Sequence, residues 1–278
     1  MQLDVLIQGF PGRAVCHGGL GWSTVALLRG GGRTALIDVG AFGVRKPLLR
    51  QLTACGVAPG DVTDVVLTHA HYDHAINFTL FPNATVWIGA DELAWAADQP
   101  PGFNPLPELY VKELSTSSRV TLLRDGDTIL PGLTAIAAPG HTPGHLLFYL
   151  TASDLPVLFT GDAAKNRAEL LSMNVHDSDD HAASVSSLDR IWAEWRKVPG
   201  TLLVPGHDLS MRLDGDTPVY VGELRESLSV WFNEDLESPQ LIDLCGGHPT
   251  GWLTGKATSA RNASGTDPVQ AAGPDRHP

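Results

Sequence analysis

The rest of the chain is organised around the stretch Thr68-His69-Ala70-His71-Tyr72-Asp73-His74. Three histidines and one aspartate fall within six positions, directly after the valine-rich apolar run 64–68, which predicts a short buried strand. Residues two apart in an extended chain point the same way, so His69 and His71 can converge on one ion. Asp73 and His74 follow where a helix can begin, and they can face a second ion beside the first.

The chemistry of these four groups favours a metal site. A lone histidine is ordinarily a surface residue or a satisfied core residue, but four such groups packed this densely would repel or stay unsatisfied without a cation. The pattern H-x-H-x-D-H is also far more specific than a single short match. Imidazole and carboxylate together suit zinc, with iron or manganese as alternatives.

Length and composition exclude several classes of protein. The chain has 278 residues, of which 43% are hydrophobic and 18% charged, which is typical of soluble globular proteins with one large or two small domains. The net charge of -12 repels phosphate backbones, so nucleic acid and anionic membranes are poor partners. No apolar run is long enough to span a bilayer. A small molecule is the expected partner, and the oligomeric state is not predicted.

The N-terminal residues and the cysteines indicate the compartment. Residues 1–4 lack a basic region followed by an apolar stretch, so no secretory signal is visible. Cys16, Cys55 and Cys245 are odd in number and widely separated. They fit reduced thiols better than a disulfide framework or a zinc knuckle. A cytoplasmic protein is expected.

Strand and helix patterns alternate along the chain and predict an α+β fold. Expected strands lie at 3–8, 23–28, 33–39, 64–68, 85–88, 119–123, 134–138, 146–150, 157–160 and 201–204. Expected helices lie at 47–55, 73–80, 90–97, 166–171 and 182–195, while 219–236 remains unassigned. Strands, then a helix, then strands and a helix again favour two sheets packed face to face with helices outside.

The C-terminal segment has a different composition. From about Thr254 the chain is rich in Gly, Ala, Ser, Thr, Asp and Pro and has few apolar residues. Such a segment cannot bury a core. We therefore expect one domain over 1–253 and a disordered tail over 254–278.

Three further strand ends carry residues of metal-ligand type. The turn Pro139-Gly140-His141-Thr142-Pro143-Gly144-His145 offers two histidines. Asp162 follows the strand 157–160, and His207 follows the strand 201–204. In each case an apolar strand runs into a glycine turn and then a potential ligand, and this repetition makes coincidence improbable.

With these motifs the sequence resembles the metallo-β-lactamase-fold hydrolase superfamily, from about Ser23 to His207. The resemblance implies a four-layer αββα sandwich with the site at one edge between the sheets. It implies one ion held by His69, His71 and His145, a second held by Asp73, His74 and His207, and Asp162 bridging both.

The resemblance also implies two residues that support the ligands without binding metal. Asp38 matches a buried aspartate that orients metal-binding histidines, in keeping with the rule that the far ring nitrogen of a ligand histidine needs an acceptor. His141, the first histidine of its turn, would lie behind the ligands. For both residues, an ordinary place in a turn is the alternative.

The reaction expected from such a site is hydrolysis. Two divalent ions, with zinc favoured, can share a water and lower its pKa, so that a metal-bridging hydroxide attacks a carbonyl while the ions steady the developing anion. Asp73 or Asp162 could return the proton to the leaving group. Asp73, beside an open metal position, is the favoured residue. The substrate would be a lactone, ester or thioester.

The resemblance is strongest to the branch of lactonases and glyoxalase-II-like thioesterases. True β-lactamases of this fold usually lack a bridging aspartate and are exported. Acyl-homoserine lactonases carry a tyrosine three residues after that aspartate, where this chain has Lys165. Lys165 could donate to an oxyanion or hold a substrate carboxylate, or be a solvated lysine at a helix start. His17 and His176 could line the pocket, although ordinary surface positions are favoured for both.

Three alternatives remain open. A mononuclear iron dioxygenase of the persulfide type shares this fold, but the full second set of Asp73, His74 and His207 speaks against it. A small-molecule phosphodiesterase fits the same ligands. A non-catalytic binding module is disfavoured because all seven ligand types are present.

Overall fold

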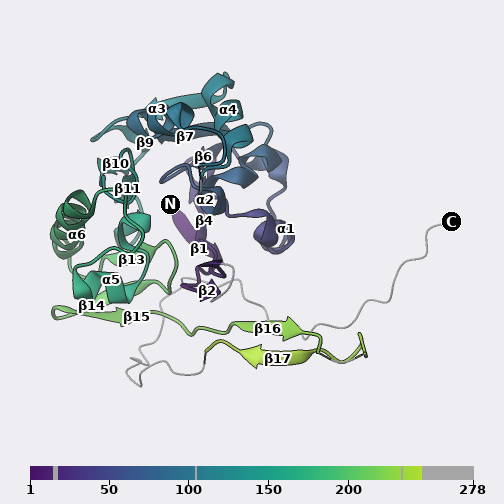
Figure 1. Cartoon of the computed structure of the whole chain (residues 1–278). Coiled ribbons are helices and arrows are strands. Elements are labelled where there is room, and N and C mark those ends of the chain that lie inside the picture. The colour runs from purple at the N-terminus through teal and green to yellow at the C-terminus, as the bar shows by residue number, and fades with distance from the viewer. Residues whose placement is uncertain (15–17, 104, 233, 246–278) are drawn as a thin grey trace.

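The computed structural model describes residues 1–14, 18–103, 105–232 and 234–245 (Figure 1). The expected tail over 254–278, Cys16 and His17 lie outside these residues. Within the described chain, every helix is too short or too polar to cross a lipid bilayer.

The N-terminal half builds a six-stranded sheet. Strands β1, β4 and β5 are antiparallel neighbours, and β5, β6, β7 and β8 follow in parallel. The strands are β1 (Gln2–Ile7), β4 (Val25–Gly30), β5 (Arg33–Ile37), β6 (Asp64–Val66), β7 (Thr85–Gly89) and β8 (Val120–Leu123). The helices of this half are α1 (Arg45–Ala54), α2 (Tyr72–Ala75), α3 (Ala90–Asp98) and α4 (Glu108–Thr116).

The C-terminal half builds a seven-stranded sheet in the order β15-β14-β13-β12-β11-β10-β9. Its central pair, β12 and β13, is parallel, and the other neighbours are antiparallel. The strands are β9 (Thr128–Leu130), β10 (Leu133–Ala137), β11 (Leu146–Leu150), β12 (Val157–Gly161), β13 (Leu202–Pro205), β14 (Met211–Asp214) and β15 (Thr217–Tyr220). The helices are α5 (Arg167–Ser172) and α6 (His181–Arg196).

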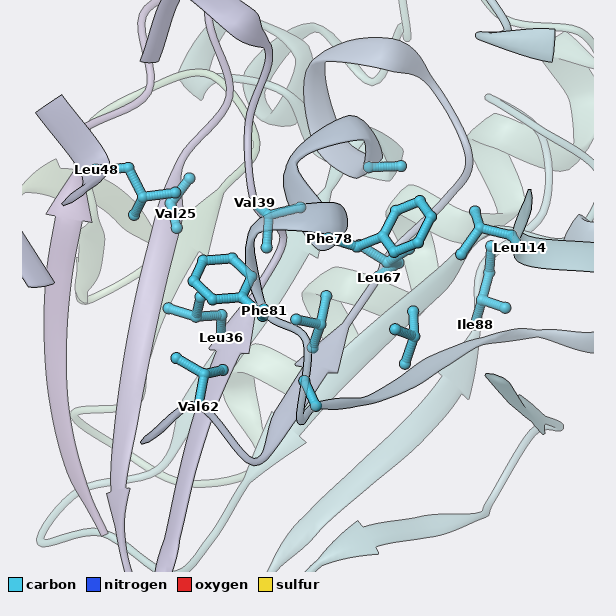
Figure 2. Packing of buried hydrophobic residues seen from close by; sticks show 14 of the residues in the cluster. Val25, Leu36, Val39, Leu48, Val62, Leu67, Phe78, Phe81, Ile88 and Leu114 are labelled. Atoms are coloured by element: carbon cyan, nitrogen blue, oxygen red, sulfur yellow. The ribbon is translucent and has the colours of Figure 1, made fainter. Parts of the chain in front are cut away.

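Three hydrophobic clusters show how these layers stack. Between the sheets, Ala26 and Val66 of the first pack with Phe148 and Val204 of the second. On the outer face of the first sheet, Leu36, Val65 and Ile88 pack against residues of its helices such as Leu48 and Leu114 (Figure 2). On the outer face of the second sheet, Leu158 and Leu203 pack against Leu188 and Trp195 of α6. The predicted four-layer αββα sandwich is therefore confirmed.

Several short elements differ from those expected. Helix α4 and strand β9 were not predicted, because each carries only two buried apolar residues, too few to set a period. The unassigned segment 219–236 contributes the end of β15 and strand β16 (Ser227–Val230), which pairs with β17 (Gln240–Asp243) in a separate, largely exposed hairpin. The strands β2 (Arg13–Ala14) and β3 (Gly18–Gly19) form another small pair.

The two sheets are joined by backbone hydrogen bonds at one edge. The Leu146 N–H donates to the Thr68 carbonyl at 3.0 Å, and the Thr24 N–H donates to the Gly206 carbonyl at 2.6 Å. Strands β5 and β6 of one sheet, and β12 and β13 of the other, end at this edge in parallel pairs. The loops that follow these strands therefore meet there, where loops commonly carry chemistry.

Candidate metal centre

Asp38 fixes the loop that carries the H-x-H-x-D-H motif. It follows β5 with a φ of 52°, an unusual backbone region for a residue other than glycine. Its buried carboxylate accepts hydrogen bonds from the Thr68 N–H at 2.8 Å, the Thr68 hydroxyl at 2.9 Å and the His74 Nδ1 at 2.8 Å. The last contact places a proton of His74 on Nδ1, so Nε2 faces away from Asp38. This is the orienting contact that the resemblance implies.

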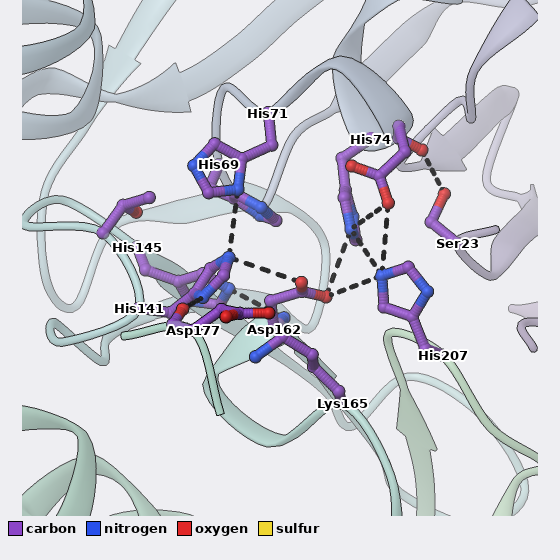
Figure 3. A network of polar contacts seen from close by, with 12 residues as sticks. Ser23, His69, His71, His74, His141, His145, Asp162, Lys165, Asp177 and His207 are labelled. Carbon is purple, nitrogen blue, oxygen red and sulfur yellow. Dashed lines mark hydrogen bonds and ion pairs between the residues drawn. The ribbon is translucent and has the colours of Figure 1, made fainter. Parts of the chain in front are cut away.

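The structure brings His69, His71 and His141 together, and we call them the three-histidine cluster. One ring nitrogen of each lies within 4.8 Å of those of the others, and all three residues are buried. His141 Nδ1 donates to the Asp177 carbonyl at 2.8 Å, so its Nε2 presents a lone pair 3.0 Å from His71 Nδ1 (Figure 3). His69 Nε2 is buried without a hydrogen-bond partner among the described residues.

His141 therefore stands where His145 was expected. His145 Nε2 accepts a hydrogen bond from the backbone N–H of Asp162 at 3.0 Å and so holds that peptide. The His145 carbonyl accepts from the Ala138 N–H, which closes the base of the turn and ties His145 to the start of β11, whereas His141 lies at the tip. Both histidines sit in one short glycine turn, and sequence spacing alone does not show which of them reaches the cluster.

A second group, the aspartate–histidine cluster, consists of Asp73, His74 and His207. His207 Nε2 lies 3.3 Å from Asp73 Oδ2 and 3.3 Å from His74 Nε2. The Ser23 hydroxyl donates to the Asp73 carbonyl and so anchors this end of the loop. The ring centroids of His69 and His74 are 4.2 Å apart, so the two clusters adjoin.

Asp162 lies between the two clusters. Its Oδ1 is 3.1 Å from His74 Nε2 and 3.2 Å from His207 Nε2, and its Oδ2 is 3.3 Å from His141 Nε2 (Figure 3). The close approach of the β13 end requires a glycine there, because a Cβ on Gly206 would lie 2.3 Å from Asp162 Oδ1. One carboxylate thus faces both groups, as the expected bridging role requires.

The histidines of the three-histidine cluster are poor bases. Burial lowers the pKa of His71 to about 4, and it lowers the pKa values of His69 and His141 well below the ordinary value. All three rings are therefore neutral at pH 7, which is the form of imidazole that binds a metal ion.

The histidines of the aspartate–histidine cluster have the opposite character. Burial alone would lower the pKa of His207, but Asp162 and Asp73 raise it to about 9. Burial is likewise outweighed at His74, whose pKa is raised well above its ordinary value by Asp162, Asp73 and Asp38. Burial would raise the pKa of Asp73, yet His74 and His207 lower it to about 2.

The two clusters fit a pair of divalent cations. Imidazole nitrogens and ionised carboxylates converge within hydrogen-bond distance. Some facing atoms, such as His71 Nδ1 and His141 Nε2, cannot both act as acceptors toward each other without a cation or a proton. A mixed nitrogen and oxygen donor set of this kind suits zinc.

Lys165 and His176 occupy neighbouring positions near the site. The Lys165 ammonium donates to the His176 carbonyl at 2.6 Å and lies 3.4 Å from Glu169 Oε1, and its side chain is 15% exposed. The imidazole of His176 is exposed, with its Nδ1 3.2 Å from Asp177 Oδ2. Lys165 therefore anchors the loop whose Asp177 carbonyl orients His141.

Sequence reasoning missed Glu92. The pair Asp91–Glu92 is typical of acidic residues in the first turn of a helix, but Glu92 is fully buried and accepts three hydrogen bonds from the loops that carry the histidines. The signal that could have found it is its place in the first turn of α3, which directly follows β7, a strand that ends at the same sheet edge as the metal-type residues.

Comparison with known proteins gives the family. Residues 18–207 match the family model of the metallo-beta-lactamase superfamily. Metallo-beta-lactamase domain-containing protein 1 of Homo sapiens is 31% identical over 199 residues, covering 70% of this chain and 65% of that protein. An N-acyl homoserine lactonase of Bacillus thuringiensis is 28% identical over 164 residues, covering 58% of this chain and 62% of that protein. Each match spans less than two thirds of the relative's length.

A solved structure shows the same architecture. AidC, a dizinc quorum-quenching lactonase in complex with a product, aligns with a TM-score of 0.60 at 17% sequence identity, covering 73% of this chain and 79% of that one. At this identity the likeness is one of fold. The family model, in contrast, matches well over half of the sequence. The chain therefore belongs to the metallo-beta-lactamase superfamily.

Proposed function

We propose that this protein is a dinuclear, zinc-dependent hydrolase that opens a lactone or cleaves a related small-molecule ester or thioester. The observation that carries the proposal is the convergence of two ligand clusters on one shared carboxylate, Asp162. The similarity to the N-acyl homoserine lactonase of Bacillus thuringiensis supports a lactone as substrate.

The geometry supports a definite set of ligands. His69, His71 and His141 would hold one ion, Asp73, His74 and His207 would hold the other, and Asp162 would contact both. His145 would bind no ion and would instead hold the backbone of Asp162 in place. Two divalent ions bound in this way would supply Lewis acidity toward a carbonyl oxygen and bring the pKa of water toward neutrality.

Asp73 is the residue that we assign to proton transfer. Its side chain is 16% exposed against 5% for Asp162, so a leaving oxygen or sulfur can approach it more readily. Burial would raise the pKa of Asp73, but His74 and His207 lower it to about 2, so its carboxylate is ionised at neutral pH. In the reaction this carboxylate would take a proton from the attacking water and pass it to the leaving group.

Lys165 is a further candidate for substrate contact. An ammonium group has three donors, and Lys165 has two acceptors among the described residues, the His176 carbonyl and Glu169. We assign the third donor to a substrate oxygen, either a developing oxyanion or a carboxylate.

An iron dioxygenase with a single ion would use only one of the two clusters. The complete aspartate–histidine cluster supports two ions instead. Elemental analysis of protein purified without added metal separates the two functions: two zinc ions per chain are expected, and one iron without zinc would reject the hydrolase.

Turnover on a panel of substrates tests the reaction itself. Zinc-loaded protein is given lactones of varied acyl length, thioesters, β-lactams and phosphodiesters, and lactone or thioester hydrolysis is expected to be fastest. His181→Ala, which changes an exposed histidine outside both clusters, serves as the control and should keep full activity. Activity on phosphodiesters with none on any carbonyl substrate would overturn the proposal in favour of a phosphodiesterase.

A further inference from the structure

Glu92 joins the two loops that carry the three-histidine cluster. It lies in the first turn of α3 and is fully buried. Its Oε1 accepts from the Ala70 N–H at 2.8 Å, and its Oε2 accepts from the Thr142 hydroxyl at 2.6 Å and from the Gly144 N–H at 3.2 Å.

These donors come from positions beside the ligands. Ala70 separates His69 from His71, and Thr142 directly follows His141. One loop extends from the first sheet and the other from the second, so the carboxylate of Glu92 spans the junction between the sheets. A change in its position would alter the separation of His71 and His141, whose facing nitrogens are 3.0 Å apart.

The packing around Glu92 leaves little room for movement. A Cβ on Gly144 would lie 1.9 Å from the Glu92 backbone nitrogen, and a Cβ on Gly89 would lie 2.7 Å from the Gly144 carbonyl oxygen. The start of α3 is thus pressed against the turn that carries His141. Because this contact is between backbones, the turn cannot shift unless the helix shifts with it.

We propose that Glu92 is a positioning residue that sets the distance between the His69–His71 loop and the His141 turn, and thereby the affinity of the three-histidine cluster for its ion. The inference rests on the proposed function, since it assigns an ion to that cluster. Glu92 contacts no reacting atom, and its effect is confined to the geometry of the ligands.

A carboxylate suits this position better than an amide does. The Ala70 and Gly144 N–H groups lie on opposite oxygens and can only donate. In Glu92→Gln, the side-chain NH2 group faces one of these donors in either orientation. One loop must then lose its hydrogen bond, and a buried donor left without a partner is costly.

The test is metal affinity, measured by competition with a chromophoric chelator for each zinc ion in turn. Glu92→Gln should lower the affinity for one zinc ion about 10–100-fold, as the loss of an outer contact of a ligand commonly does. The affinity for the other ion should stay within about threefold of the wild-type value. The visible spectrum of the cobalt-loaded protein should shift. Asp91→Asn, an exposed acid in the same helical turn, should change neither. Wild-type affinities and an unshifted spectrum in Glu92→Gln would overturn the inference, and so would equal weakening of both ions.

A second pair of variants keeps the test informative if Glu92→Gln does not fold. Thr142→Val removes one donor to Glu92 and should lower the affinity for the same zinc ion by a smaller factor. Thr142→Ser keeps the hydroxyl and should have the wild-type affinity. An unchanged affinity in Thr142→Val, or no restoration by Thr142→Ser, would count against the inference. Because affinity is measured without turnover, a wild type that binds two ions but hydrolyses no carbonyl substrate would reject the proposed function alone.

Discussion

The three-histidine cluster and the aspartate–histidine cluster use the same imidazole groups in opposite protonation states. The three-histidine cluster is buried with rings whose pKa values are lowered, for example to about 4 at His71. In the aspartate–histidine cluster, Asp162 and Asp73 overcome burial and raise the pKa of His207 to about 9. Burial keeps the rings of the three-histidine cluster neutral, whereas the carboxylates beside the aspartate–histidine cluster outweigh burial and keep its rings protonated.

This contrast has a consequence for metal loading. At neutral pH the rings of the three-histidine cluster already offer lone pairs, whereas His74 and His207 retain protons that hold them against Asp73 and Asp162. A cation entering the aspartate–histidine cluster must displace those protons. The first ion to bind is therefore expected at the three-histidine cluster.

Removing the shared carboxylate should have the largest effect. Asp162→Asn deprives both clusters of their common negative charge, so kcat/KM should fall on the order of 10³-fold. Elemental analysis should show fewer than two ions per chain. Retention of two ions with near-normal turnover would mean that the clusters are independent and that Asp162 does not join them.

Replacing each of the two turn histidines by alanine should separate their roles. His141→Ala should lose the ion of the three-histidine cluster and reduce kcat/KM by at least about 100-fold, because it removes a ligand. His145→Ala should keep both ions and reduce kcat/KM about tenfold, because it removes only a hydrogen bond that holds the backbone of Asp162. Zinc content and turnover of the two variants measure this directly. The reverse order of effects would return the ligand role to His145.

The pH dependence of metal binding should differ between the clusters. His207, with its pKa of about 9, is protonated at pH 7, so binding at its cluster should strengthen about tenfold per pH unit for each proton released, and the contribution of His207 should level off above pH 9. Binding at the three-histidine cluster should be flat over this range, because the pKa of His71 is already about 4.

Calorimetric titration in buffers of different ionisation enthalpy counts the protons released in each step. About one or two are expected for the second ion and about none for the first. Equal proton release in both steps would remove the distinction between the clusters.

The smallest effect is expected at Lys165, which lies outside both clusters. Lys165→Met should reduce kcat/KM about three- to tenfold by removing a donor to the substrate and a contact of the loop that orients His141. Both ions should remain bound. Steady-state kinetics with zinc analysis gives the result, and loss of an ion would instead make Lys165 part of the support of the three-histidine cluster.

Much of the fold could be predicted because hydrophobic pattern is a local property. The strands that end in ligands were found from short apolar runs followed by glycine turns, and the two packed sheets followed from their order along the chain. Helix α4 was missed because its buried side chains, Val111 and Leu114, become visible only against the helices and sheet around them.

Candidate site residues could be named from the sequence where metal-type side chains are concentrated, and not where a role depends on tertiary contact. The motif at 69–74, Asp162 and His207 were named as candidates, and the structure brings these side chains together. The choice between His141 and His145 depends on which ring the turn directs inward, and the role of Glu92 depends on donors from two distant loops. Neither is encoded in local spacing.

Each sheet supplies part of the ligand set. His69, His71, Asp73 and His74 extend from the N-terminal sheet, whereas His141, Asp162 and His207 extend from the C-terminal sheet. A pair of ions at this edge would cross-link the two halves of the chain, because their ligands come from segments far apart in sequence. Removal of the metal would therefore first destabilise the edge where the two sheets meet. Catalytic activity and the packing of the sheets would be lost at the same place.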